Sequence, residues 1–179
     1  MKAKAATAML ALVGLLAMSA CGAVVVLPDT SQTSTLTATV SEQCTITVPA
    51  TITFTVNDIG SQTTADNAAL NISNIALATA TKQLKLSVQG DAADFTPPVG
   101  GATTWAVGDV TWTAGTWTNG TGSTGTLSDS SYSTVATATA DVATLSTTAL
   151  PFRLAAKTTV KRSGDHTLGI HWKVESTGA

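Results

Sequence analysis

The sequence predicts an all-β protein: a single antiparallel, immunoglobulin-like β-sandwich that follows an N-terminal signal peptide. Three observations favour this fold. Thr accounts for 35 of the 179 residues, and its β-branched side chain packs better on a pleated sheet than on a helix. Apolar and polar residues alternate along many short runs, which is the period of a strand with one buried face. Clusters of Gly, Pro, Asn and Asp separate these runs, as expected for turns.

The composition excludes several classes of protein. Charged residues make up 11% of the chain, hydrophobic residues 44%, and the formal net charge is -2. Disordered chains combine low hydrophobicity with high net charge, so this chain is too apolar to be one of them. Nucleic-acid binding depends on clustered Lys and Arg, which the sequence lacks. We therefore expect no nucleic-acid partner.

Residues 1–20 are predicted to form a signal peptide. Lys2 and Lys4 precede an uncharged apolar run over residues 8–18, and the small residues Ser19 and Ala20 follow it. This order is typical of a secretory signal, and the run is shorter than the ~20 apolar residues of a transmembrane helix. The sequence therefore predicts export to a bacterial cell surface, the periplasm and outer membrane, or the medium.

Cys21 has two mutually exclusive interpretations. The segment Met18-Ser19-Ala20-Cys21 resembles a bacterial lipobox, which implies a lipid on Cys21 and contact with a membrane only through that anchor. Cleavage elsewhere leaves Cys21 able to form a disulfide with Cys44 in an oxidising compartment. Cleavage after Ala23 would instead leave Cys44 alone.

The mature chain divides into residues 21–40, an N-terminal arm or first strand, and residues 41–179, the β-sandwich domain. In the arm, Leu36, Ala38 and Val40 alternate with threonines. Alternation of this kind also predicts strands at 46–48, 52–56, 84–88, 150–154 and 168–174. A strand is favoured over a helix at 70–77, because Asn and Ser there are poor helix formers. Residues 120–149 are predicted to form either a long surface excursion or strands of small residues.

Residues that could support catalysis or bind a metal are few. The two histidines, His166 and His171, are five positions apart and would point to opposite faces of one strand. Zinc sites need several converging ligands, and hydrolases need a nucleophile beside a base. No such pattern occurs, so the sequence predicts neither an enzyme nor a cofactor.

Aromatic residues gather in the middle of the chain. Trp105, Trp112 and Trp117 fall within thirteen positions, and Tyr132 follows. If exposed, these rings would form a surface for stacking against sugars, which is the basis of an alternative function as a carbohydrate-binding module. Large aromatic side chains also pack in cores and subunit interfaces, so both interpretations stay open.

Two segments resemble known bacterial domains. Residues 44–54, CTITVPATITF, are similar to the first strand of secreted pilin-type domains, including the spore coat protein U group. Residues 164–174, GDHTLGIHWKV, resemble the final strand of such subunits and also the end of Trp-x-Leu surface domains. The resemblance implies a bacterial surface β-sandwich.

The resemblance also implies a way to assemble. An incomplete sandwich exposes a sheet edge, and an extended segment of a neighbouring molecule can add the missing strand. The candidate donor segment is residues 34–40, with Leu36, Ala38 and Val40 entering the neighbour's groove; alternatively, these residues form the sandwich's own first strand. The sequence therefore predicts a structural or adhesive subunit of a pilus, fibre or coat. Its expected partners are further copies of itself, other surface proteins or a glycan.

Overall fold

The protein is all-β. The computed structural model describes residues 34–66, 69–139 and 142–178, which form antiparallel strands and one short 3₁₀ turn, with no α-helix among them. The chain divides into Met1–Ala38 and Thr39–Ala179, and the strands of the described residues belong to the second unit. The predicted signal peptide and Cys21 lie outside the described residues. This architecture confirms the predicted fold class, while the immunoglobulin-like strand order stays a prediction.

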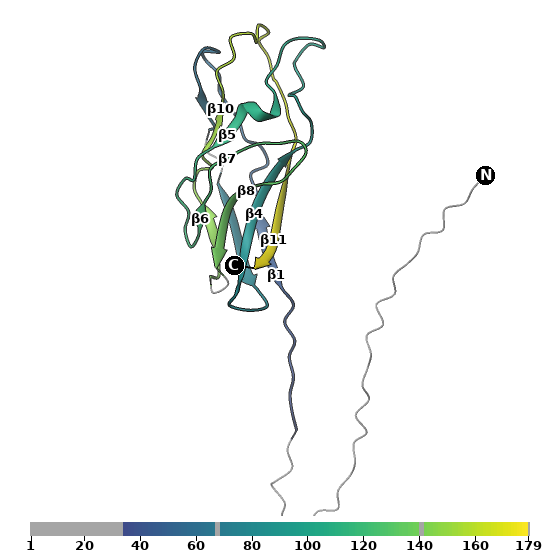
Figure 1. Ribbon diagram of the computed structural model, residues 1–179, viewed down its shortest axis with the longest axis vertical. Coiled ribbons are helices and arrows are strands. Elements are labelled where there is room, and N and C mark those ends of the chain that lie inside the picture. The colour runs from purple at the N-terminus through teal and green to yellow at the C-terminus, as the bar shows by residue number, and fades with distance from the viewer. Residues whose placement is uncertain (1–33, 67–68, 140–141, 179) are drawn as a thin grey trace, which may run out of the picture. The chain divides into compact units, whose positions relative to one another are not determined.

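Three antiparallel sheets make up the domain (Figure 1). The first contains β1 (Gln43–Thr47), β3 (Leu70–Ala76) and β9 (Leu145–Thr147), in the order β1-β3-β9. The second has the order β2-β10-β5-β7, with β2 at Thr63–Thr64, β10 at Phe152–Leu154, β5 at Val110–Trp112 and β7 at Gly125–Thr126. The third has the order β11-β4-β8-β6, with β11 at Ile170–Gly178, β4 at Lys82–Gly90, β8 at Ser133–Thr139 and β6 at Thr121–Gly122. A 3₁₀ turn, η1 (Val107–Asp109), leads into β5.

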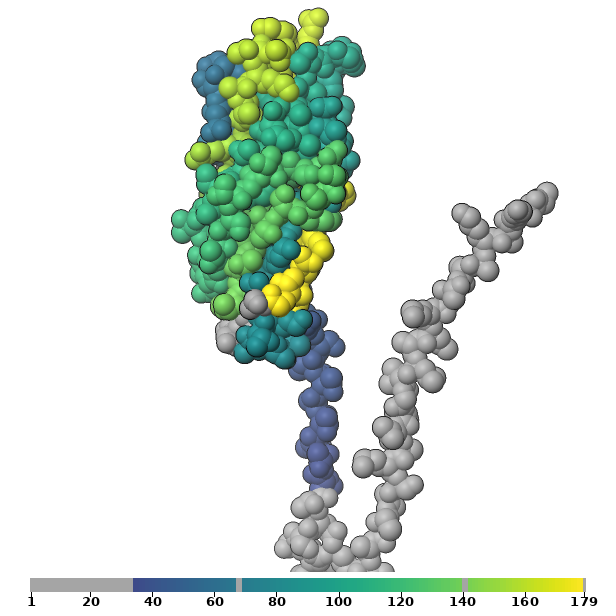
Figure 2. Space-filling view, in the orientation of Figure 1, coloured from purple at the N-terminus to yellow at the C-terminus, as the bar shows by residue number. Residues whose placement is uncertain are grey.

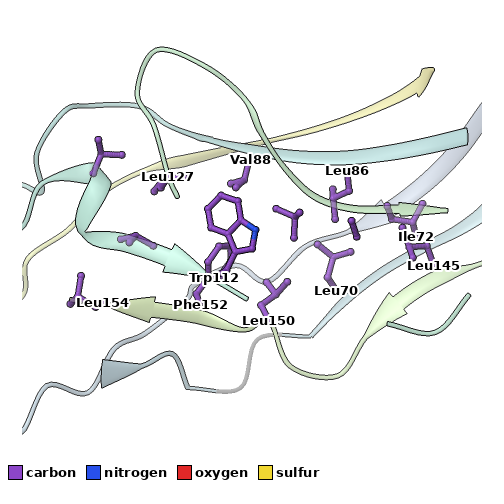
Figure 3. Close-up of a cluster of buried hydrophobic side chains, with 14 of the residues drawn as sticks. Leu70, Ile72, Leu86, Val88, Trp112, Leu127, Leu145, Leu150, Phe152 and Leu154 are labelled. Atoms are coloured by element: carbon purple, nitrogen blue, oxygen red, sulfur yellow. The ribbon is translucent and has the colours of Figure 1, made fainter. Parts of the chain in front are cut away.

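The hydrophobic core lies between the third sheet and the other two. In Figure 3, Leu86 and Val88 of β4 face Leu70 of β3 and Phe152 of β10, with the Trp112 ring between them. Trp112 and Phe152 are cross-strand neighbours whose rings meet edge to face at 5.3 Å. Burial of these apolar side chains is the main contribution to the stability of the domain.

Small residues form strands within residues 120–149, a segment whose structure the sequence left ambiguous. The predicted strands of small residues within 120–149 are present as β6, β7, β8 and β9. Ala136 and Ala138 of β8 are buried beside Val135, so this part of the core is filled by methyl groups and short aliphatic chains. The long surface excursion is therefore wrong for the described part of this segment.

Most predicted strands are confirmed, and two are not. The runs at 70–77, 84–88, 150–154 and 168–174 correspond to β3, β4, β10 and β11. Residues 34–42 and 51–56 form no strand, although both alternate as strands do. The interpretation of residues 34–40 as the sandwich's own first strand is therefore wrong, and the first strand begins at Gln43. Alternation favours a strand only where a partner supplies hydrogen bonds, and within the described residues neither segment has one.

Gly125 is expected to be required for close packing of the core. A Cβ at this position would lie 2.6 Å from Cε2 of Trp112, a contact that a rigid indole cannot relieve. We expect Gly125→Ala to lower the free energy of unfolding by about 1–3 kcal/mol, the usual cost of overpacking. Gly108→Ala is the matched control, because a Cβ at Gly108 meets nothing within 4 Å. Urea denaturation measures both; equal stability of the two variants would contradict the packing of Trp112 on Gly125.

Candidate functional site

A long apolar groove opens along one side of the domain. Its volume is about 1230 Å³. One wall is formed by residues 48–56, which follow β1, and the other by residues 161–172, which lead into β11. Core side chains form the floor: Val88, Phe95, Trp105, Val110, Leu127, Phe152 and Leu154. The groove therefore lies directly over the core, and each of these floor side chains is at most 9% exposed.

The first wall is an extended segment that belongs to no sheet. Pro49 ends the β1 ladder, because proline has no N–H to donate. Beyond it, Ile52, Phe54 and Val56 turn toward the core, while the threonines between them are exposed. Asp66 N donates to Thr53 O at 2.8 Å and so attaches the segment to the domain. Because no described strand pairs with residues 51–56, much of their backbone is free for a further strand.

The second wall, residues 161–172, ends in the edge strand β11. Within the described residues its only strand partner is β4, along Ile170↔Gly90 to Gly178↔Lys82. Ile170 and Trp172 face the groove, and the Trp172 ring centroid lies 6.2 Å from that of Phe152. On the opposite face, Glu175 forms ion pairs with Lys85 and Lys173. The far edge of β11 thus offers unpaired N–H and C=O groups beside an apolar floor.

One end of the groove, here called the mouth, consists of residues 161–166. His166 fixes this loop: its Nδ1 lies 2.8 Å from Thr104 Oγ1, and its Nε2 donates to Arg162 O at 3.1 Å. Its ring also meets Trp105 edge to face at 5.2 Å. Lys161 and Arg162 are exposed there and line the groove. The mouth is therefore an ordered, positively charged rim on an apolar groove.

The chain enters the domain at the opposite end. Glu42 Oε1 accepts hydrogen bonds from Ala78 N at 2.8 Å and from Ser176 Oγ at 2.9 Å. These two bonds, the first above all, lower the pKa of Glu42, and the charge of Lys82 lowers it further. Glu42 thereby holds the start of β1 against the C-terminal end of β11. Figure 2 shows the end of β11 (yellow) and the yellow-green segment that contains the mouth at different ends of this face.

The tryptophan cluster does not form the exposed surface that a sugar-binding module needs. Trp105 and Trp112 are only 5% and 1% exposed, which favours the interpretation of these two rings as core residues. Trp112 points inward with Val110 from β5, and Trp105 is fixed in the groove floor by donation from its Nε1 to Ala155 O at 2.9 Å. Trp117 is half-buried, with its Nε1 bonded to Ala114 O. Tyr132 is 42% exposed beneath Lys173 Nζ, 5.5 Å from the ring centroid.

The predicted donor segment is exposed throughout. Leu36 is 97% and Val40 73% exposed, and Ala38 between them is exposed as well. The structure thus leaves all three apolar side chains of the donor segment without cover.

Cys44 is half-buried on β1 and has no disulfide partner among the described residues; burial raises the pKa of its thiol. Cys21, the candidate for lipidation and the partner in the disulfide alternative, lies outside the described residues.

The described residues contain no group of three His, Cys, Asp or Glu side chains that could hold a metal ion. No helix in that part of the chain is long and apolar enough to cross a membrane. No family model, curated protein or solved structure matches the chain.

Sequence reasoning missed the groove. Its two walls were both recognised as alternating runs, at 52–56 and 168–174. What the pattern did not show is that these runs leave a space between them that no described strand fills. Pro49, directly after the β1 pattern, was the one signal that the first run leaves its sheet.

We expect Glu42 to make the stability of the domain depend on pH. Because its pKa is lowered on folding from an ordinary value of about 4.5, its contribution is present above that value and is lost as the pH falls through the lowered pKa. Glu42→Gln should therefore reduce the urea midpoint at pH 7, and the difference from the wild type should shrink toward pH 3. Asp129→Asn is the control, since within the described residues its carboxylate accepts no hydrogen bond. A difference that persists at pH 3 would contradict the role of the Glu42 charge.

Proposed function

We propose that the protein is an exported, non-enzymatic structural subunit of a bacterial cell-surface fibre, pilus or coat. Copies join by strand addition, in which the donor segment, residues 34–40, of one copy fills the groove of another. The observation that carries this proposal is the open apolar groove between residues 48–56 and β11. Export and surface location rest on the predicted signal peptide.

The groove offers an added strand both main-chain hydrogen bonds and apolar contacts. Strand addition derives affinity from main-chain hydrogen bonds and specificity from alternate side chains that enter pockets. The free edge of β11 offers the hydrogen bonds, and the apolar floor offers sites for alternate side chains. In the donor segment, Leu36, Ala38 and Val40 lie two residues apart, as this mode of binding needs.

The direction of the strand determines which molecule supplies it. All strand pairings in the described sheets are antiparallel, and antiparallel pairing is the more stable arrangement. A strand antiparallel to β11 has its C-terminal end at the mouth, whereas Gln43 of the same molecule lies near the other end. The three steps from Val40 to Gln43 span at most about 11 Å. The wall of residues 48–56 is about 26 Å long at 3.3 Å per residue, so the donor must come from a second copy.

The carbohydrate-binding alternative receives less support. Stacking against a sugar needs an open aromatic face, and Trp105 and Trp112 offer none. Tyr132 is the exposed member of the four, and Lys173 lies over its ring. The half-buried Trp117 and the partly covered Tyr132 are a weak basis for a sugar site.

The proposal predicts that the apolar face of the donor segment drives assembly. Leu36→Asp combined with Val40→Asp should weaken association at least tenfold, because each buried Leu or Val contributes roughly 1.5–3 kcal/mol and a carboxylate in the groove is costly. Thr35→Asp combined with Thr39→Asp is the matched control: it adds the same charge to the opposite face of the segment and should still assemble. Sedimentation velocity over a range of concentrations measures both.

Two results would contradict this function. One is a wild-type mature protein that stays monomeric at high concentration, both in sedimentation and in negative-stain images. The other is equal loss of assembly in both double variants, which would point to charge rather than to insertion of the apolar side chains.

A further inference from the structure

We infer that Lys161 and Arg162 at the mouth bind the carboxylate of Glu42 from the incoming copy, and that this contact fixes the direction and register of the inserted strand. The inference rests on the proposed function and specifies which part of the partner the mouth recognises. It concerns charged residues at one end of the groove and so can be tested separately from the insertion of apolar side chains.

The two cations of the mouth are available for a partner. Both are exposed and line the groove. In the part of the chain that the structure describes, neither takes part in a salt bridge, whereas the nearby Lys157 is paired with Asp109 at 2.8 Å. Asp165 and His166 share the mouth, and His166 is occupied by Thr104 and Arg162 O. The loop therefore presents two cations and one carboxylate, a net positive charge, to an inserted strand that emerges at the mouth.

Glu42 is the matching group on the donor. Within residues 34–42 it is the only charged residue. Its Oε1 accepts both hydrogen bonds from its own domain, from Ala78 N and Ser176 Oγ. Its Oε2 accepts none from the described residues. Because a carboxylate has two oxygens with several acceptor sites, Glu42 can hold its own β1 in place and bind a cation of another copy at the same time.

Length and side-chain parity agree with this contact. From Leu36 to Glu42 an extended strand covers about 20 Å at 3.3 Å per residue, which fits along the groove wall of about 26 Å. Glu42 lies on the same face of such a strand as Leu36 and Val40, because side chains alternate and the three are an even number of positions apart. With the strand antiparallel to β11, Glu42 emerges at the mouth, where the two cations lie.

The contact has a consequence for the assembly. In the donor molecule Glu42 lies beside the C-terminal end of β11; in the acceptor it would lie at the mouth, the other end of the groove. Successive copies would therefore join through different surfaces, head to tail. Such heterologous contacts produce open chains unless the rotation closes a ring, whereas a strand parallel to β11 would permit a closed, reciprocal pair.

The charge contact is tested with a peptide. The receptor is the full chain carrying Leu36→Asp and Val40→Asp, whose own donor segment is inactive, and the probe is a labelled peptide of residues 34–42. Measured by fluorescence anisotropy, a peptide with Glu42→Gln should bind roughly two- to fivefold more weakly, the range of an exposed ion pair. This preference should fall with added salt. It should vanish in a receptor with Lys161→Glu and Arg162→Glu, and persist in the control receptor with Arg153→Glu and Lys173→Glu.

The direction is tested by cross-linking. A peptide that ends in cysteine at position 43 is bound to a receptor in which Cys21 and Cys44 are replaced by serine. It should form a disulfide with Ser163→Cys at the mouth and not with Gly178→Cys at the end of β11. Equal binding of the Glu and Gln peptides, or cross-linking at position 178, would overturn the inference while leaving strand addition intact. If neither peptide binds, the proposed function fails and this inference fails with it.

Discussion

The pairing of β11 with β4 is the constraint on which the rest of the structure depends. This ladder is continuous from Ile170, beside the groove, to Gly178. Through β4 it anchors Leu86 and Val88 in the core, and through β11 it presents Trp172 to the groove. A strand has two edges and β4 occupies one of them; no strand of the described residues occupies the other, which can accept a further strand.

The groove is kept open by the rigidity of its floor. The ring of Phe152 lies between those of Trp112 and Trp172 and contacts both, and Trp105 is fixed by its hydrogen bond to Ala155 O. Close-packed interiors do not collapse to fill a space of this size without breaking such contacts. The wall of residues 51–56 is held from the outside by Asp66, which binds both the backbone of Thr53 and the hydroxyl of Thr55. The open site is therefore defined by ordered groups on every side.

The sequence predicted the fold class and most strands because these follow from local patterns. Alternation, β-branched residues and turn clusters are enough to place β3, β4, β10 and β11. The candidate site was harder to predict, because local patterns do not show which segments far apart in the chain lie side by side, as residues 48–56 and 161–172 do. Residues 52–56 and β8 illustrate this: the first was predicted as a strand and has no strand partner in the described residues, while Ala136 and Ala138 of the second have a weak pattern, which left two alternatives open, and are buried in a sheet. The burial of the tryptophans was ambiguous for the same reason, since it depends on which strands pack against each other.

The composition of the donor segment also affects the cost of inserting it. Fixing a residue in an extended conformation costs roughly 1–2 kcal/mol of backbone entropy, which must be offset by new hydrogen bonds and apolar burial. Thr35, Thr37 and Thr39 lower this cost, because β-branched side chains already restrict the chain toward extended conformations. Their hydroxyls face away from the groove in the proposed complex and keep the segment soluble before it inserts. A Thr-rich segment with three spaced apolar residues can thus remain exposed in one molecule and still add to the sheet of another.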